Sequence, residues 1–176
     1  KLIEIIKSIH DRGVIHRDIK PENIITSYPD ELIRGKIEGG STSKMYVKLV
    51  DFGLAVKYSN LPFIVGTSYK LRDFCGSPGF FAPELLENKG YNNRVDWWSF
   101  GCVVLEFIIK NVDFTRNWMS LYTPVNIRSY SVFIENMKLR LPKIKKQAEK
   151  DPFRDEYLLK IVNNTLNINP EERTLY

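Results

Sequence analysis

Eight consecutive residues, from His16 to Asn23, carry side chains that could move a phosphoryl group onto a hydroxyl. Asp18 can accept the proton of the attacking hydroxyl, and Lys20 can neutralise negative charge on the phosphoryl group. The amide oxygen of Asn23 can bind a magnesium ion. The same residues could also form a polar surface turn, so their meaning depends on the rest of the chain.

Three further motifs and a single arginine come later in the chain, in a fixed order. They are Asp51-Phe52-Gly53, Ala82-Pro83-Glu84, the run from Asp96 to Gly101, and Arg173. This order resembles that of the eukaryotic protein kinase family, and the resemblance covers nearly the whole chain. It implies a mainly α-helical large lobe with short β-hairpins at the catalytic loop, residues 16–23. The parent domain of such a lobe is α+β and has two lobes.

The resemblance implies roles for single residues of the site. It makes Asp18 the catalytic base, Lys20 a partner of the ATP phosphates, and Asn23 and Asp51 the ligands of Mg²⁺. Kinases specific for serine and threonine resemble this chain in the lysine at Lys20 and the small hydroxyl residue at Ser77. The expected reaction is therefore phosphorylation of serine or threonine in a protein substrate, with ATP as the donor.

Other residues are expected to hold the site together. Asp96 enters an apolar helix, where a carboxylate must be paired or hydrogen-bonded. In the family this position anchors the backbone of the catalytic loop. The resemblance further implies that His16 packs against Phe52, and that Glu84 and Arg173 form a buried salt bridge.

Residues 51–84 correspond to the activation segment of the family. In the family, an arginine at the position of Arg17 binds a phosphate group on this segment. Asp73 occupies the position at which related kinases carry a phosphorylated threonine. We hypothesise that its carboxylate holds Arg17 weakly but permanently. The alternative is a phosphosite within residues 67–69, with Asp73 merely solvated.

Glu22 bears on the choice of substrate. Relatives with the same Lys-Pro-Glu-Asn sequence often use this glutamate to bind an arginine upstream of the phosphorylated residue. A preference for basic residues before the target is therefore expected. The strings Cys75–Pro78 and Asp96–Trp98 are most similar to those of the cyclic-nucleotide-dependent and calmodulin-dependent kinases.

Hydrophobic periodicity predicts the elements that position these residues. A first helix carries apolar residues at i, i+3, i+4 and i+7 and ends at Gly13. Short strands are expected at residues 24–25 and 47–50, the second leading directly into Asp51. Residues 94–110 are apolar on most sides and predict a buried helix, and residues 155–166 predict an amphipathic one. His10, on the first helix, has no evident partner and is interpreted as structural.

A complete kinase domain also needs a Gly-rich loop over the ATP phosphates and a lysine–glutamate pair in its small lobe. The chain contains no Gly-x-Gly-x-x-Gly, and few residues precede the catalytic loop. We therefore expect residues 1–176 to be a partial domain, lacking the small ATP-binding lobe and the last helix. Residues 27–45 are interpreted as a loop insertion, passive or partner-binding. A catalytically silent pseudokinase or truncated interaction module is the alternative function.

Composition limits the remaining possibilities. The 176 residues are 43% hydrophobic, which suffices for one core. Two distant cysteines argue against a disulfide framework and favour a reducing intracellular setting, cytoplasm or nucleus. No apolar run approaches the length of a membrane span. The net charge is +5, but apolar and acidic residues interrupt the basic stretch 138–150. We interpret that stretch as a solvated helix face and expect no nucleic-acid partner.

Overall fold

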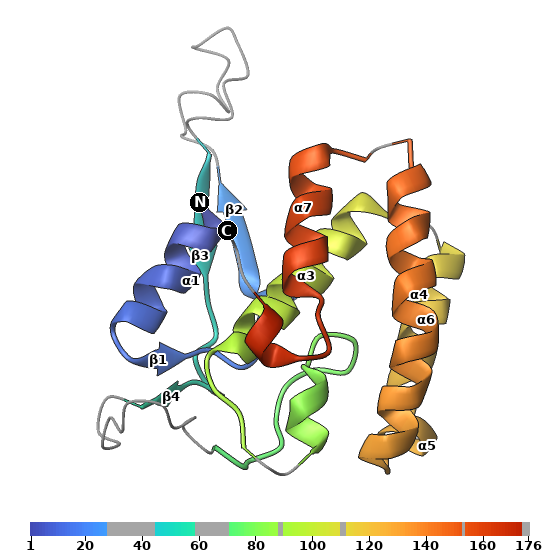
Figure 1. Ribbon diagram of the computed structural model, residues 1–176. Helices are drawn as coiled ribbons and strands as arrows, with labels where there is room; N and C mark the ends of the chain where they lie inside the picture. Colours follow the sequence, from blue (N-terminus) through green and yellow to red (C-terminus); the bar gives the residue numbers. More distant parts are fainter. Residues whose placement is uncertain (28–44, 59–70, 88–89, 110–111, 153, 174–176) are drawn as a thin grey trace, which may run out of the picture.

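The computed structural model describes residues 1–27, 45–58, 71–87, 90–109, 112–152 and 154–173. The expected insertion lies outside these ranges except for its two end residues, and so do residues 67–69. A small β-structured part with the first helix lies on one side of the molecule, and the other helices lie on the opposite side (Figure 1). The predicted fold class, a mainly helical kinase-like large lobe, is confirmed.

The first helix, α1 (Leu2–Asp11), packs its apolar stripe against the core, and Ile6 is completely inaccessible while the other residues of the stripe are partly buried. Gly13 follows with φ at 74°, a conformation that glycine adopts without strain, and its N–H donates to the carbonyl of His10. The helix therefore ends where the sequence predicted, directly before the catalytic loop.

Two antiparallel strand pairs bring the catalytic loop next to residues 50–55. The strand β1 (Val14–Ile15) pairs with β4 (Val56–Lys57), and β2 (Ile24–Ser27) pairs with β3 (Tyr46–Leu49). The catalytic loop connects β1 to β2, and the loop that begins the activation segment connects β3 to β4. Because each strand of one connection pairs with a strand of the other, the two loops must lie side by side. The β1–β4 pairing was not predicted, since two-residue strands carry almost no periodic signal.

The helix α3 (Arg94–Ile108) forms the centre of the helical part. Trp98, Leu105 and Ile108 are each at most 1% exposed. The helix α7 (Glu156–Thr165) packs across it so closely at Gly101 that a β-carbon there would collide with the Thr165 side chain. Both helices confirm the elements predicted from periodicity.

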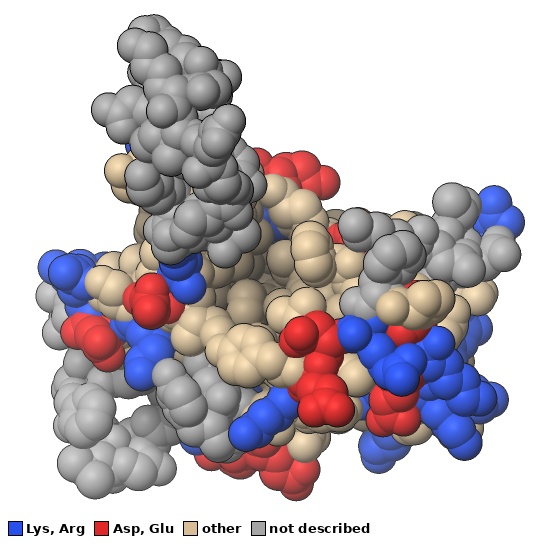
Figure 2. Space-filling view, turned by 90° about the horizontal axis from the view of Figure 1, so that it is seen from above, with Lys and Arg blue, Asp and Glu red and all other residues tan. Residues whose placement is uncertain are grey.

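Residues 112–150 form a second helical group, of which the sequence indicated only the solvated helix face at residues 138–150. It consists of α4 (Val112–Met119), the 3-10 helix η4 (Ser120–Tyr122), α5 (Pro124–Ile127) and α6 (Tyr130–Lys150). In α6 the buried positions include Phe133, Met137 and Leu141, while most of its lysines are exposed. Figure 2 shows Lys and Arg gathered on this side of the molecule, interspersed with acidic residues.

Short 3-10 helices complete the structure, namely η1 (Pro21–Asn23), η3 (Pro83–Leu86) and η5 (Pro170–Glu172). Aromatic edge-to-face contacts join the activation segment to the second helical group. Phe81 lies 4.9 Å from Tyr122 between ring centroids, and Tyr122 lies 5.2 Å from Phe133. In the described part of the chain, no helix combines the length and hydrophobicity that crossing a bilayer requires.

Candidate active site

Asp18 is the centre of a compact polar cluster. Its Oδ1 accepts a hydrogen bond from the Ser77 hydroxyl at 2.8 Å, and its Oδ2 lies 2.9 Å from Lys20 Nζ. Lys20 Nζ also donates to the Ser77 hydroxyl at 2.8 Å. The amide nitrogen of Asn23 donates to the backbone carbonyl of Asp18 at 2.8 Å and to its carboxylate at 3.2 Å. The structure thus brings together four residues that sequence reasoning assigned to the site.

The surroundings of Asp18 favour the ionised form of its carboxyl. Burial by itself would raise the pKa of Asp18. Hydrogen bonds from Lys20, Ser77 and Asn23, together with the charge of Lys20, outweigh burial and lower the pKa below its ordinary value. The carboxylate is therefore ionised at neutral pH and can accept a proton.

Asp96, which is completely buried, holds the backbone that carries Asp18. Its Oδ2 accepts from the N–H of His16 at 2.9 Å, and its Oδ1 accepts from the N–H of Arg17 at 2.8 Å. The Nε2 of His10 lies 2.8 Å from Oδ2 and donates to it, because an ionised carboxylate only accepts. The predicted contact between Asp96 and the catalytic loop is present. His10, for which the sequence showed no evident partner, has one 86 residues away, and this contact agrees with a structural role.

His16 connects the catalytic loop to residues 50–52. Its Nε2 lies 3.1 Å from the carbonyl of Val50, and its Nδ1 accepts from the N–H of Asp18 at 3.3 Å. The two contacts are mutually consistent when Nε2 carries the proton. The ring meets Phe52 edge-on with 4.8 Å between centroids, which is the contact predicted from the resemblance.

Asn23 and Asp51 lie on the adjoining edges of the two loops. The N–H of Val50 donates to the carbonyl of Asn23 at 2.9 Å, so Asp51 directly follows a residue that is bonded to Asn23. Asp51 has a φ of 61°, a conformation uncommon outside glycine, and its Oδ1 accepts from Gly53 N–H at 3.2 Å. The amide nitrogen of Asn23 already serves as a donor, so its oxygen is the atom available to a cation.

This donor set fits magnesium. Mg²⁺ prefers oxygen ligands and takes one or two from protein carboxylates, the rest coming from substrate phosphates and water. No group of three or more His, Cys, Asp or Glu side chains suited to a metal occurs within the described ranges. A cation held by the oxygens of Asn23 and Asp51 would therefore depend on the phosphates of a bound nucleotide.

Arg17 joins three segments of the chain. Its Nε donates to the carbonyl of Leu54 at 2.6 Å, and its Nη1 donates to the Tyr91 hydroxyl at 2.8 Å. Nη1 also lies 3.9 Å from Oδ2 of Asp73, whose side chain is 82% exposed. The Arg17–Asp73 pair expected from the sequence is thus close to the limiting distance of an ion pair, and its carboxylate is solvated. A pair at this distance with an exposed carboxylate contributes about 0–1 kcal/mol.

Glu84 and Arg173 form the expected buried pair. Arg173 Nη2 donates to Glu84 Oε2 at 2.7 Å, and Nη1 donates to Oε1, so the contact is bidentate. Both side chains are nearly inaccessible. The guanidinium carbon lies 5.0 Å from the ring centre of Trp98 on α3. The pair therefore ties the end of the activation segment to the core of the helical part.

A cavity of about 350 Å³ opens beside the cluster. Lys20, Glu22 and Ser77 are among the residues that line it, and so are Glu106 and Met119. Burial, and secondarily the negative charge of Glu22, raises the pKa of Glu106 above its ordinary value. Glu106 lies on α3, 84 positions after Glu22, and no motif pointed to it. An acidic residue on an otherwise apolar helix was the available signal.

Comparison with known proteins agrees with this geometry. A family model described as "Protein kinase domain" matches residues 1–175. The chain is 32% identical to serine/threonine-protein kinase cds1 of Schizosaccharomyces pombe, over 98% of the chain and 32% of that protein. It is 38% identical to cGMP-dependent protein kinase isozyme 1 of Drosophila melanogaster, over 61% of the chain and 11% of that protein. It is 37% identical to CBL-interacting protein kinase 17 of Oryza sativa, over 71% of the chain and 24% of that protein.

The expected similarity to serine/threonine kinases is confirmed by these relatives. The aligned part of the chain corresponds to about a third or less of the length of each relative. The similarity is therefore limited to one part of each of these longer relatives.

Proposed function

The chain belongs to the protein kinase family, and on this premise we propose that the full-length protein transfers the γ-phosphate of ATP to serine or threonine hydroxyls. One observation carries the proposal. A single carboxylate, that of Asp18, has a hydroxyl, an ammonium and an amide within 3.2 Å. This is the arrangement that general-base activation of a hydroxyl beside a phosphoryl group requires.

Each residue of the cluster has a definite task in the proposed reaction. Asp18 takes the proton of the substrate hydroxyl while the hydroxyl oxygen forms its bond to the γ-phosphorus. The bond from that phosphorus to the bridging oxygen breaks, and ADP leaves with the electron pair. Lys20 places its positive charge where negative charge gathers on the transferred group. The contact between Ser77 and Asp18 already shows that the carboxylate can accept from an aliphatic hydroxyl.

Magnesium and the nucleotide complete the site. Asn23 and Asp51 are the residues proposed to hold Mg²⁺, which when bound neutralises phosphate charge. Asn23 is buried, and its amide is oriented by two bonds to Asp18, so its oxygen is held in place before any ligand arrives. Pre-orientation of this kind lowers the entropy lost on binding.

A substrate with basic residues before its target fits the cavity beside the cluster. Glu22 and Glu106 place two carboxylates in one cavity next to Lys20 and Ser77. Burial, and then the charge of Glu22, raises the pKa of Glu106, so its ionised carboxylate is unfavourable in this place. A cation bound nearby would stabilise the ionised carboxylate. A guanidinium can satisfy two carboxylates at once through its planar set of donors, which favours arginine over lysine.

We further propose that the protein works in a reducing intracellular compartment. Cys75 and Cys102 are both free thiols, and Cys102 is buried in α3. Expression of the full-length protein with a fluorescent tag would test this part of the proposal directly, and a secreted product would contradict it.

The proposed activity can be tested with the full-length protein, Mg-ATP and a panel of serine, threonine and tyrosine peptides. We expect phosphate transfer to serine and threonine peptides that is lost in an Asp18→Asn variant. Absence of transfer with every peptide, together with intact binding of protein partners, would instead support the silent interaction module. Transfer that favours tyrosine would contradict the roles proposed for Lys20 and Ser77.

A further inference from the structure

Tyr91 contacts the activation segment at a position to which no motif pointed. It is 3% exposed and directly precedes the loop that leads into α3. Its N–H donates to the carbonyl of Leu71 at 3.2 Å, and the two residues form an isolated antiparallel bridge. The backbone of the activation segment is therefore attached to Tyr91 before its side chain is considered.

The Tyr91 hydroxyl connects Arg17 to Asp73 with a fixed direction of hydrogen bonding. It accepts from Arg17 Nη1 at 2.8 Å and donates to the backbone carbonyl of Asp73 at 2.9 Å. A guanidinium can only donate and a carbonyl can only accept, so the bond to the carbonyl of Asp73 needs the hydroxyl in its protonated form. Burial, partly opposed by the bond from Arg17, raises the pKa of Tyr91 to about 12, and the proton is present at neutral pH.

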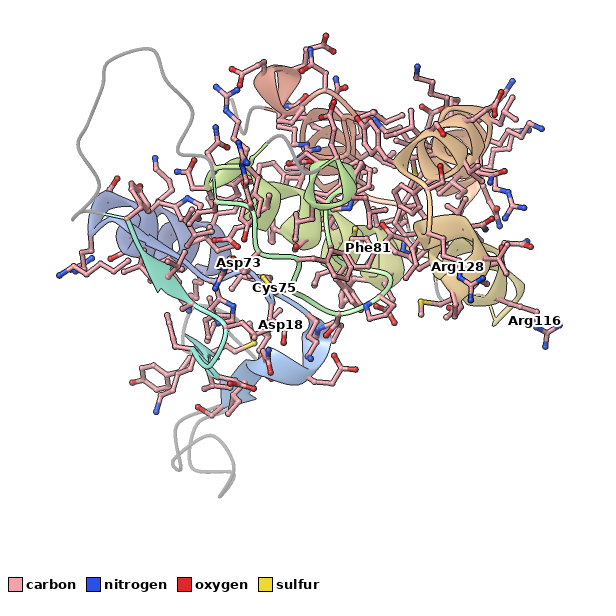
Figure 3. All side chains as sticks on the ribbon, turned by 90° about the horizontal axis from the view of Figure 1, so that it is seen from below. Asp18, Asp73, Cys75, Phe81, Arg116 and Arg128 are labelled. Atoms are coloured by element: carbon pink, nitrogen blue, oxygen red, sulfur yellow. The ribbon has the colours of Figure 1, made fainter. Side chains whose placement is uncertain are left out.

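The carboxylate of Asp73 plays a smaller part than its backbone in this connection. Its Oδ2 is 3.9 Å from Arg17 Nη1 and its side chain is 82% exposed, whereas the bonds through Tyr91 are shorter and partly buried. Figure 3 shows Asp73 beside Cys75, with Asp18 close by. The Sγ of Cys75 lies 3.9 Å from the Tyr91 hydroxyl. Solvent screens the exposed carboxylate of Asp73, and a partly buried hydrogen bond to the guanidinium is screened less.

We propose that Tyr91 is a positioning residue whose hydroxyl fixes the activation segment on Arg17. Arg17 is in turn bonded to Asp96 through its N–H and to the carbonyl of Leu54 through Nε. The hydroxyl thus links the segment that carries Ser77 to the loop that carries Asp18. This role rests on the proposed kinase activity, but the contact itself has a consequence that can be measured without catalysis.

Three variants of the full-length protein separate the hydroxyl from the carboxylate. Tyr91→Phe removes the hydroxyl alone, and Asp73→Ala removes the carboxylate but keeps the carbonyl that Tyr91 uses. Tyr58→Phe is the matched control, because the Tyr58 hydroxyl also donates to a backbone carbonyl at 2.9 Å, but to that of His10 on α1. Hydrogen exchange of residues 71–77 and steady-state kinetics are measured on each variant.

We expect Tyr91→Phe to speed exchange at residues 71–77 by about tenfold and to lower kcat by about tenfold, with the KM for ATP nearly unchanged. Asp73→Ala and Tyr58→Phe should change both quantities by less than about threefold. Unchanged exchange in Tyr91→Phe, faster exchange without a fall in kcat, or a larger effect of Asp73→Ala would each overturn the role of Tyr91. If the wild-type protein transfers no phosphate, the proposed function fails, and the exchange data alone decide whether Tyr91 holds the segment.

Discussion

The carboxylate of Asp96 accepts the backbone N–H of Arg17 at 2.8 Å, across 79 positions of sequence. Arg17 has a φ of 69°, in the left-handed region that non-glycine residues rarely occupy. Such a conformation persists only where surrounding contacts hold it in place. Asp96, buried at the start of α3, holds it by accepting the backbone N–H. The strained backbone turns Arg17 toward the activation segment and places Asp18 in the cluster.

Removing the Asp96 carboxylate should therefore destabilise the fold as well as the site. Asp96→Ala leaves the N–H groups of His16 and Arg17 and the Nε2 of His10 without their acceptor. Each unsatisfied buried group costs about 1–3 kcal/mol, so we expect the free energy of unfolding to fall by about 3 kcal/mol or more. Urea denaturation of the purified chain measures this change.

Asp155→Ala provides the comparison for Asp96→Ala. Asp155 also accepts a backbone N–H, that of Leu158 at 3.0 Å, but at the exposed start of α7. Loss of an exposed helix cap typically costs about 1 kcal/mol. Equal losses in the two variants would show that Asp96 is no more than a helix-terminal carboxylate.

Replacement of Asp18 should separate chemistry from nucleotide binding. Asp18→Asn keeps the size of the side chain but removes the proton acceptor, so we expect kcat of the full-length protein to fall by about 10²–10⁴. The KM for ATP should change little, because Asp18 is assigned to the hydroxyl and not to the phosphates. Near-normal turnover in Asp18→Asn would rule out the role of general base. Asp11→Asn, at the exposed end of α1, is the control for a charge change alone.

The parts of the structure that could be predicted are those specified by local pattern and those implied by the family resemblance, such as the Glu84–Arg173 pair. The helices α1, α3 and α7 follow from apolar spacing, and the catalytic loop follows from closely spaced residues such as Asp18 and Asn23. The His10–Asp96 contact could not be predicted in this way, because His10 belongs to none of the motifs and lies 86 positions from Asp96. The same reason applies to Tyr91, whose partners belong to two other segments.

The helices at residues 112–137 were not predicted for a different reason, whereas the sequence indicated a helix face at residues 138–150. The stretch before Pro124 departs from the family pattern, and α6 contains Pro142 within its 21 residues. A proline inside a helix weakens the local preference for one continuous helix over residues 130–150. Tertiary packing overrides this effect, since Phe133, Met137 and Leu141 on one face are buried, each at most 5% exposed.

The Glu84–Arg173 pair should behave as a buried bridge rather than a surface one. Glu84→Gln leaves the Arg173 guanidinium buried without its counter-charge, and we expect the free energy of unfolding to fall by roughly 3–5 kcal/mol. Urea denaturation of the chain measures the loss. In the double variant Glu84→Gln with Arg173→Met, the loss should be smaller than the sum of the single losses, because no uncompensated charge remains. Additive losses would mean that the two residues do not interact.

The two carboxylates of the cavity should make substrate preference depend on pH. Glu22→Gln or Glu106→Gln should lower the preference for arginine before the target residue by about tenfold, as expected for the loss of one charge-assisted hydrogen bond. The measurement is the ratio of kcat/KM for a peptide with arginine to that for a matched peptide with alanine. Glu135→Gln, exposed on α6, is the control and should leave the ratio unchanged.

The direction of the pH effect depends on Glu106. Burial, and then the charge of Glu22, raises its pKa, so on acidification Glu106 takes up a proton at a higher pH than an ordinary glutamate. Only the ionised form attracts a guanidinium, and the arginine preference of the wild-type protein should therefore weaken as pH falls toward the raised pKa. The lowered pKa of Asp18 keeps the proposed base ionised over the same range, so the ratio reports on the cavity alone.

In Glu106→Gln the ratio of kcat/KM values should be lower at neutral pH and nearly constant with pH. A wild-type preference that stays constant on acidification, or a Glu106→Gln variant that keeps the wild-type pH profile, would show that Glu106 does not contact the substrate.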